Sequence, residues 1–114
     1  MKEIEKELDR LVQRLSNGRR CCVCGGMATE THHIIGKQTP LQRYDLVNFA
    51  YVCRDCHRDI HDKGVKVPIF AVQKDYLESL RNKSYKDFLT FEAKMSETEY
   101  LKWCKKIFTN LLRK

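Results

Sequence analysis

The chain has 114 residues, with 22 Lys and Arg against 15 Asp and Glu, a formal net charge of +7, six Cys and four His. This length predicts a single small domain, and the positive charge favours a polyanionic partner. No apolar run approaches the roughly 18 residues that a membrane span requires, and the charged first residues predict no secretory signal. The 42% hydrophobic content argues against disorder.

The charge is distributed unevenly. Residues 1–20 carry +2 and residues 63–114 carry +6, whereas residues 21–62 carry −1 and contain all four His and five of the six Cys. We therefore expect one domain, 1–114, with basic helical flanks around a central chemical site. Its parts are an N-terminal helix (1–20), a core (21–64) and C-terminal helices (65–114).

The first segment has the apolar periodicity of an amphipathic helix. Its apolar residues recur at the spacing of one helical face: Ile4, Leu8, Leu11, Val12 and Leu15. Asn17-Gly18 then predicts the end of this helix, because Gly is the usual residue beyond a helix C-terminus.

The central segment changes character several times. Residues 30–35 are β-prone, residues 36–47 have the Gly, Pro and polar content of a loop, and residues 48–53 are β-prone again. Residues 54–63 predict a short helix that ends at Gly64. The expected order is strand, long loop, strand and helix.

The C-terminal flank predicts further helices. An apolar stripe after Pro68 favours a helix over residues 69–80, and a short helical piece is expected at 84–94. Ser96-Glu97-Thr98-Glu99 is a capping box that opens a last helix. One face of that helix carries Tyr100, Leu101, Cys104, Ile107, Phe108, Leu111 and Leu112.

Four cysteines form two C-x2-C pairs: Cys21 with Cys24, and Cys53 with Cys56. Two residues between thiolates let a tight turn direct both sulfurs at one ion, and four thiolates complete a tetrahedron, so the pairs predict a structural zinc site. A disulfide framework is the alternative, and Cys22 could replace Cys21 as a ligand. Cys104 is expected to be a buried thiol of the last helix.

The four histidines form two further pairs. His32 and His33 are adjacent in the first β-prone segment, where neighbouring side chains point to opposite faces unless the strand bends. His57 and His61 are four residues apart, so they share one face of the predicted helix and could hold a metal ion together. The pattern indicates a second metal centre.

Together with Asn48, these residues resemble the motif of the HNH endonuclease family. The resemblance rests on residues 31–35 (THHII), Asn48 and residues 53–61 (CRDCHRDIH), and it covers roughly residues 21–64. Within this family, the chain looks similar to small phage-encoded HNH nucleases. It implies an α+β fold: a small ββα-metal core with a structural zinc site, flanked by N-terminal and C-terminal helices.

The resemblance also implies metal-dependent hydrolysis of DNA phosphodiester bonds, in the cytoplasm of a bacterium or of a phage-infected host cell. His33 would be the general base, and Asn48 would hold the loop that orients it. The catalytic ion would be bound by His32, His57 and His61. Three imidazoles favour Zn²⁺, Ni²⁺ or Mn²⁺, and Mg²⁺ stays open because water and phosphate can supply further ligands.

Four cations near this motif are candidate contacts to the DNA backbone: Lys37, Arg43, Arg54 and Arg58. The C-terminal flank could add a second DNA contact, or the helical flanks could form the interface of a homodimer or bind a phage or host protein. The alternative function is a zinc-stabilised DNA-binding or adaptor module without nuclease activity. A zinc-finger-type scaffold for protein contacts would give Asn48 and His33 no role.

Overall fold

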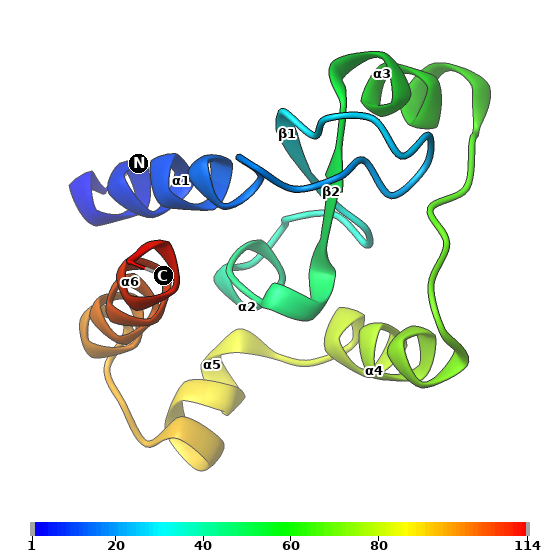
Figure 1. Ribbon diagram of the computed structural model, residues 1–114. Helices are drawn as coiled ribbons and strands as arrows, with labels where there is room; N and C mark the ends of the chain where they lie inside the picture. The colour runs from blue at the N-terminus through cyan, green and yellow to red at the C-terminus, as the bar shows by residue number, and fades with distance from the viewer. Residues whose placement is uncertain (1, 114) are drawn as a thin grey trace.

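The computed structural model describes residues 2–113, in which helices surround one small antiparallel sheet (Figure 1). This arrangement confirms the predicted α+β class. No helix within the described range is both long and apolar enough to cross a membrane. In chain order the elements are α1 (Glu3–Leu15), β1 (Glu30–His33), α2 (Pro40–Arg43), the 3-10 turn η1 (Leu46–Asn48), β2 (Phe49–Val52), α3 (Arg54–Lys63), α4 (Ala71–Arg81), α5 (Tyr85–Asp87), the π-helical turn η2 (Phe88–Ala93) and α6 (Glu97–Leu112).

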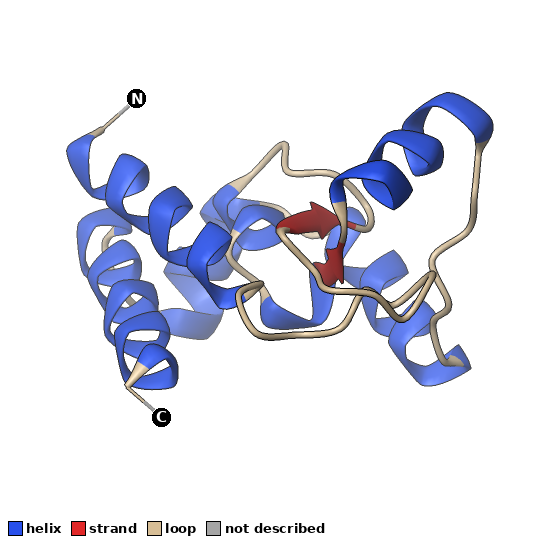
Figure 2. Cartoon of the chain, turned by 45° about the horizontal axis from the view of Figure 1, so that its top comes forward, coloured by secondary structure: helices blue, strands red, loops and turns tan. Residues whose placement is uncertain are grey.

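The two strands form an antiparallel hairpin at the centre of the molecule (Figure 2). Glu30 pairs with Val52 at one end, and His33 pairs with Phe49 at the other. The first strand was predicted to continue to residue 35, but it ends at His33. The reason is that the Ile35 N–H bonds to a side chain, Oδ1 of Asn48, and no longer to a strand partner.

The predicted loop at 36–47 contains two short elements that the sequence analysis did not foresee. Pro40 begins α2, as its fixed φ suits a first helical turn. Asp45 caps η1, because its side chain accepts a hydrogen bond from the Val47 N–H at 2.9 Å. The sequence contains both signals: the proline that begins α2 and the aspartate that caps η1.

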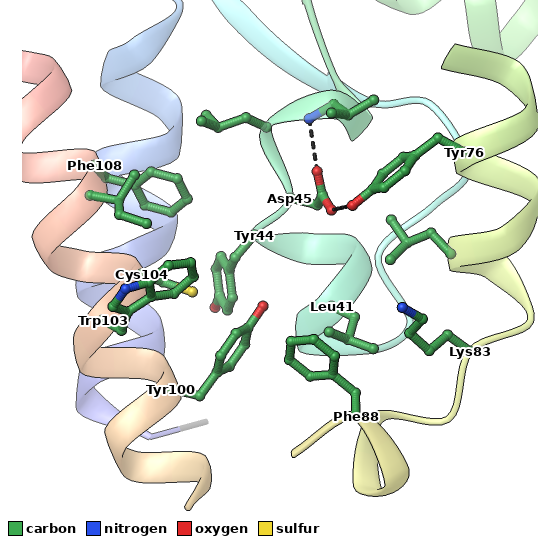
Figure 3. A pocket seen from close by; sticks show the side chains of 14 residues that line it. Leu41, Tyr44, Asp45, Tyr76, Lys83, Phe88, Tyr100, Trp103, Cys104 and Phe108 are labelled. Atoms are coloured by element: carbon green, nitrogen blue, oxygen red, sulfur yellow. Dashed lines mark hydrogen bonds between the residues drawn. The ribbon is translucent and has the colours of Figure 1, made fainter. Parts of the chain in front are cut away.

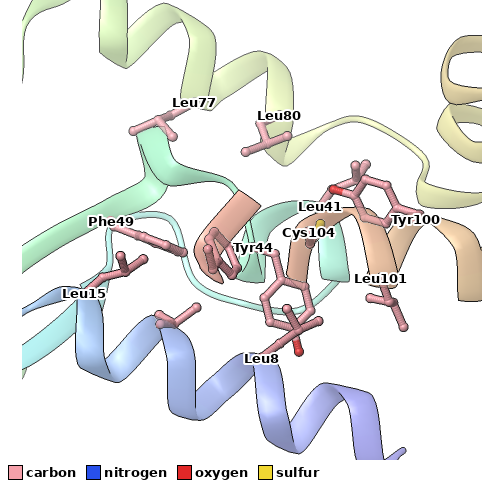
Figure 4. Close-up of a cluster of buried hydrophobic side chains, with 12 residues drawn as sticks. Leu8, Leu15, Leu41, Tyr44, Phe49, Leu77, Leu80, Tyr100, Leu101 and Cys104 are labelled. Carbon is pink, nitrogen blue, oxygen red and sulfur yellow. The ribbon is translucent and has the colours of Figure 1, made fainter. Parts of the chain in front are cut away.

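The hydrophobic core lies in the helical half of the molecule. Helices α1 and α6 lie side by side there (Figure 1), and α2, β2 and α4 close the cluster. Each fully buried Leu or Phe contributes about 2 kcal/mol of hydrophobic stabilisation. The buried members, most of them labelled in Figure 4, are Leu8, Val12, Leu15, Leu41, Tyr44, Phe49, Leu77, Leu80, Tyr100, Leu101, Cys104 and Phe108.

Helix α3 is different, because none of its residues is buried. It has the predicted bounds: the Cys53 sulfur caps its start, and Gly64 ends it with a left-handed φ of 68°. Helix α4 begins at Ala71, two residues later than predicted, after an extended strap at 64–70. The capping box of Ser96 and Glu99 at the start of α6 is confirmed.

Candidate metal centres

The four predicted zinc ligands come together. The sulfur atoms of Cys21, Cys24, Cys53 and Cys56 all lie within 4.8 Å of one another. Cys22 lies outside this group and its side chain is exposed. Within residues 2–113 all six cysteines are free thiols, so the disulfide alternative finds no support. The cluster is consistent with a structural metal such as zinc.

Local hydrogen bonds explain why each pair converges. The Cys21 N–H donates to the Gly26 carbonyl at 2.7 Å, which closes a tight turn, and the Gly26 N–H donates to the Cys24 sulfur at 3.4 Å. Gly25 has a φ of 79°, which only glycine adopts without strain. The second pair uses the start of α3, where the Cys56 N–H donates to the Cys53 sulfur at 3.4 Å.

Backbone N–H groups around Cys21 favour the thiolate form that a metal requires. Burial alone would raise the pKa of Cys21, but hydrogen bonds from the backbone N–H groups of Cys24, Cys53 and Val23 outweigh it and lower the pKa to about 6. A thiolate in this position is ready to bind a soft divalent ion. Four cysteine sulfurs around one ion would fill a tetrahedron and leave no position for a substrate.

Three histidines form a second cluster, with ligand nitrogens within 4.8 Å of one another. The ring centroids are 5.1 Å apart for His32 and His57, 5.2 Å for His32 and His61, and 5.0 Å for His57 and His61. His32 is buried, and burial together with the neighbouring histidine charges lowers its pKa to about 4. It is therefore neutral at pH 7, as a metal ligand must be.

Glu30 completes the surroundings of this cluster, and the sequence analysis missed it. Its Oε1 lies 2.7 Å from Nδ1 of His57, so the bond fixes the ring and leaves Nε2 available for an ion. The signal was the spacing, because Glu30 stands two residues before His32 and so shares its face of β1. Nε of Arg54 lies 3.7 Å from Oε2, the other carboxylate oxygen of Glu30.

The alternation of β1 places His33 on the opposite face, toward α1. On that face the Thr31 hydroxyl donates to the Val12 carbonyl at 3.0 Å. Nε2 of His33 lies 3.0 Å from the Arg43 carbonyl, and its ring meets Phe49 edge-on at 5.3 Å. Adjacent histidines therefore take two different environments, as the strand pattern predicts, and His33 is not one of the clustered ligands.

The bond to Arg43 decides the chemistry of His33. Because a carbonyl only accepts, Nε2 carries the proton in the neutral ring and Nδ1 remains a free acceptor. Burial lowers the pKa of His33 below its usual value, partly offset by the bond to the carbonyl. The ring is consequently uncharged at neutral pH, and its Nδ1 is able to take a proton.

Asn48 is fully buried and joins three parts of the loop. Its Oδ1 accepts from the Ile35 N–H, and its Nδ2 donates to the carbonyls of Gly36 and Gln42, each at 2.9 Å. The same residue therefore ties the residues just after β1 to α2. Removing it would leave three polar groups without partners.

The four predicted phosphate contacts have different surroundings. Lys37 is exposed and makes no ion pair within residues 2–113, and Arg54 is 85% exposed although it lies near Glu30. Arg58 is exposed beside Asp55 at 3.5 Å. Arg43 instead lies against α1, where its side chain is 3.5 Å from Asp9 and 4.0 Å from Glu5. Its charge is balanced there and supports packing.

Comparisons with profiles of known protein families, with curated proteins and with solved structures found no match. The function of the chain is therefore inferred from its own residues.

Proposed function

We propose that the protein is a metal-dependent HNH-type endonuclease that hydrolyses phosphodiester bonds in DNA. The observation that carries the proposal is the convergence of His32, His57 and His61 beside a separate His33, whose Nε2 bonds to a carbonyl and leaves Nδ1 as an acceptor. Three imidazole donors would hold an ion and leave part of its coordination sphere open, as a hydrolytic centre requires. In this proposal the hairpin and α3 are the ββα-metal core.

His33 is the general base. Nδ1 takes a proton from a water molecule, whose oxygen attacks the phosphorus; the bond to the 3′-oxygen breaks, and a solvent water molecule gives a proton to the departing oxygen. The products are a 5′-phosphate and a 3′-hydroxyl. Because His33 and the clustered ligands occupy opposite faces of β1, the phosphate has to lie at the end of the strand, where His33 is the last residue.

The remaining residues prepare these groups. Glu30 orients His57, and the Arg43 carbonyl keeps the proton of His33 on Nε2. Asn48 fixes the loop that carries Arg43. A bound divalent ion would supply Lewis-acid stabilisation of the charge that develops on the phosphate.

DNA as the substrate is supported by the distribution of charge. The central segment is formally −1, and the excess positive charge lies on residues 1–20 and 63–114. Lys37, Arg54 and Arg58 remain exposed near the proposed centre. Binding should therefore weaken steeply with added salt, because phosphate contacts release counterions.

The test is cleavage of plasmid DNA with Mg²⁺, Mn²⁺, Ni²⁺ or Zn²⁺. We expect wild-type protein to cleave and His33→Ala to lose about 10²-fold or more of the rate. Gln38→Ala is the control, because Gln38 lies in the loop that follows β1 and its side chain is exposed. Equal cleavage by His33→Ala and wild type would remove His33 from the mechanism.

The second candidate is a zinc-stabilised DNA-binding or adaptor module. The exposed cations and the four-cysteine cluster support this binding module as much as they support the nuclease. The free Nδ1 of His33, by contrast, would have no role in a binding module. The same experiment separates the two. Salt-dependent DNA binding by a protein that cleaves with none of the four ions would establish the module and overturn the nuclease.

A further inference from the structure

A helix outside the HNH-like segment holds the turn that carries Asn48. The hydroxyl of Tyr76, on α4, donates to Oδ2 of Asp45, the residue that caps η1 (Figure 3). Nε2 of Gln73, one helical turn earlier, donates to the Val47 carbonyl at 3.0 Å. Two side chains of α4 thus bind two consecutive parts of the same turn.

Asp45 transmits this contact to the backbone of η1. Its Oδ1 accepts from the Val47 N–H at 2.9 Å, which Figure 3 shows as the second dashed line on the carboxylate. Its carbonyl accepts from the Asn48 N–H at 3.0 Å. One oxygen of the carboxylate therefore shapes η1 while the other receives Tyr76, so the orientation of η1 depends on α4.

From Asn48 the bonds continue to the proposed general base. Nδ2 of Asn48 holds the Gln42 carbonyl, and the next residue, Arg43, supplies the carbonyl that accepts from Nε2 of His33. Each link is a hydrogen bond of 2.9 to 3.0 Å. A displacement of η1 consequently moves the group that fixes the tautomer and direction of His33.

The apolar packing of α4 does not fix the position of η1, so the hydrogen bonds between α4 and η1 do so. Leu77 and Leu80 are buried and hold α4 against the core, but apolar contacts have no preferred direction. A cavity of about 380 Å³ lies between α4 and α6, so α6 does not press α4 onto η1 (Figure 3). The directional contacts from α4 to η1 are those of Tyr76 and Gln73.

We propose that Tyr76 and Gln73 are positioning residues, through which α4 fixes η1, Asn48 and the His33 ring for phosphodiester hydrolysis. The inference rests on the proposed nuclease function and extends its machinery beyond residues 21–64. In this proposal the C-terminal flank affects the rate of hydrolysis, independently of any contribution that it makes to DNA binding.

The first test compares Tyr76→Phe with Ser79→Ala. Both remove one hydroxyl from α4, but Ser79 is exposed and has no hydrogen-bond partner within residues 2–113. We expect Tyr76→Phe to lower kcat about tenfold with KM for DNA within about twofold, because small displacements of a reacting group are costly. Adding Gln73→Ala should lower kcat further. Ser79→Ala should match wild type.

The second measurement does not depend on activity. Hydrogen exchange of the Asn48 side-chain amide and the Ile35 N–H, followed by NMR, reports the order of the loop directly. We expect both to exchange faster in Tyr76→Phe than in Ser79→Ala. If wild-type protein cleaves no DNA, the proposed function fails, but this exchange still decides whether α4 positions the loop.

Two results would overturn the inference. One is a Tyr76→Phe protein with the kcat and exchange rates of Ser79→Ala. The other is a loss of kcat that disappears on cooling to a temperature at which thermal unfolding shows the variant fully native, because the loss then reflects stability alone. A lowered kcat that persists in fully native protein, with unchanged KM, supports it.

Discussion

The cysteine and histidine clusters share helix α3, yet they differ in how many donors each provides. Cys53 and Cys56 at the start of α3 join two thiols from the turn at residues 21–26, and the four sulfurs would saturate a tetrahedral ion. His57 and His61, one and two helical turns after Cys53, are joined by one further ligand within residues 2–113, His32. The difference separates a site suited to holding the fold from one suited to binding a substrate.

The cysteine cluster also accounts for the stability of α3, a helix that buries none of its residues. Helix α3 has no buried residue, whereas α1, α4 and α6 each contribute several side chains to the hydrophobic core. A ten-residue helix without packing is marginal in water. We infer that an ion bound by the four cysteines would fix the start of α3. The positions of His57 and His61 would then depend on that ion.

The largest effect should follow from breaking the cysteine cluster. Cys53→Ser removes both a ligand and the sulfur that caps α3, so we expect loss of zinc and a fall of about 5 kcal/mol or more in the free energy of unfolding. Urea denaturation and elemental analysis would measure both. Cys22→Ser is the control and should keep its zinc, because Cys22 lies outside the cluster.

Removing a histidine ligand should instead spare the fold. His61 is exposed, so His61→Ala should change the free energy of unfolding by no more than about 0.5 kcal/mol. The second ion should bind more than about 100-fold less tightly, which calorimetric titration of zinc-loaded protein with Ni²⁺ or Mn²⁺ would detect. Collapse of α3 in this variant would show that both clusters stabilise the fold.

A smaller effect is expected from the carboxylate behind the histidines. Glu30→Gln keeps the shape of the side chain but weakens its hold on His57, so the second ion should bind about 10- to 100-fold less tightly. Asp55→Asn is the matched control, since it removes an equal charge from an exposed position on α3. Equal affinities in the two variants would mean that Glu30 contributes only its charge.

The cysteine pairs and the His57–His61 pair were predictable because they depend on local spacing, whereas the resemblance to the HNH family supplied His32 as the third histidine. Two residues between cysteines and three between the helical histidines fix the directions of the side chains before any tertiary contact forms. The bounds of α3 followed in the same way from its polar sequence and from Gly64. The predicted grouping of four cysteines and of His32 with His57 and His61 is confirmed by the structure.

The contacts that orient these groups were not predictable, because they join residues far apart in the sequence. Glu30 reaches His57 across 27 positions, and Tyr76 reaches Asp45 across 31. The spacing places Glu30 on the same face of β1 as His32, but it does not indicate that Glu30 binds His57, and nothing in the spacing links Tyr76 to Asp45. The role of Arg43 was missed for a related reason: its backbone carbonyl holds His33, and a carbonyl leaves no mark in the sequence.

The smallest expected effect concerns which cysteines react, and it sharpens the assignment of the cluster. Burial raises the pKa of Cys104 to about 11, and the residue is 3% exposed, so at about pH 9 only about one per cent of it is thiolate and reagent cannot reach it. Cys22 also has a raised pKa, but its side chain is exposed. Zinc-loaded protein treated with iodoacetamide should therefore gain one adduct, on Cys22, by mass spectrometry.

Chelation and denaturation should then release all six thiols for labelling, which is the control for reagent and time. The order of labelling carries the information, because a zinc-bound sulfur shares its lone pair with the ion and reacts slowly. If Cys21 were labelled before Cys22, the ion would be held by Cys22 in its place. The turn from Cys21 to Gly26 would then have to rearrange, since its present hydrogen bonds direct Cys21 and Cys24 inward together.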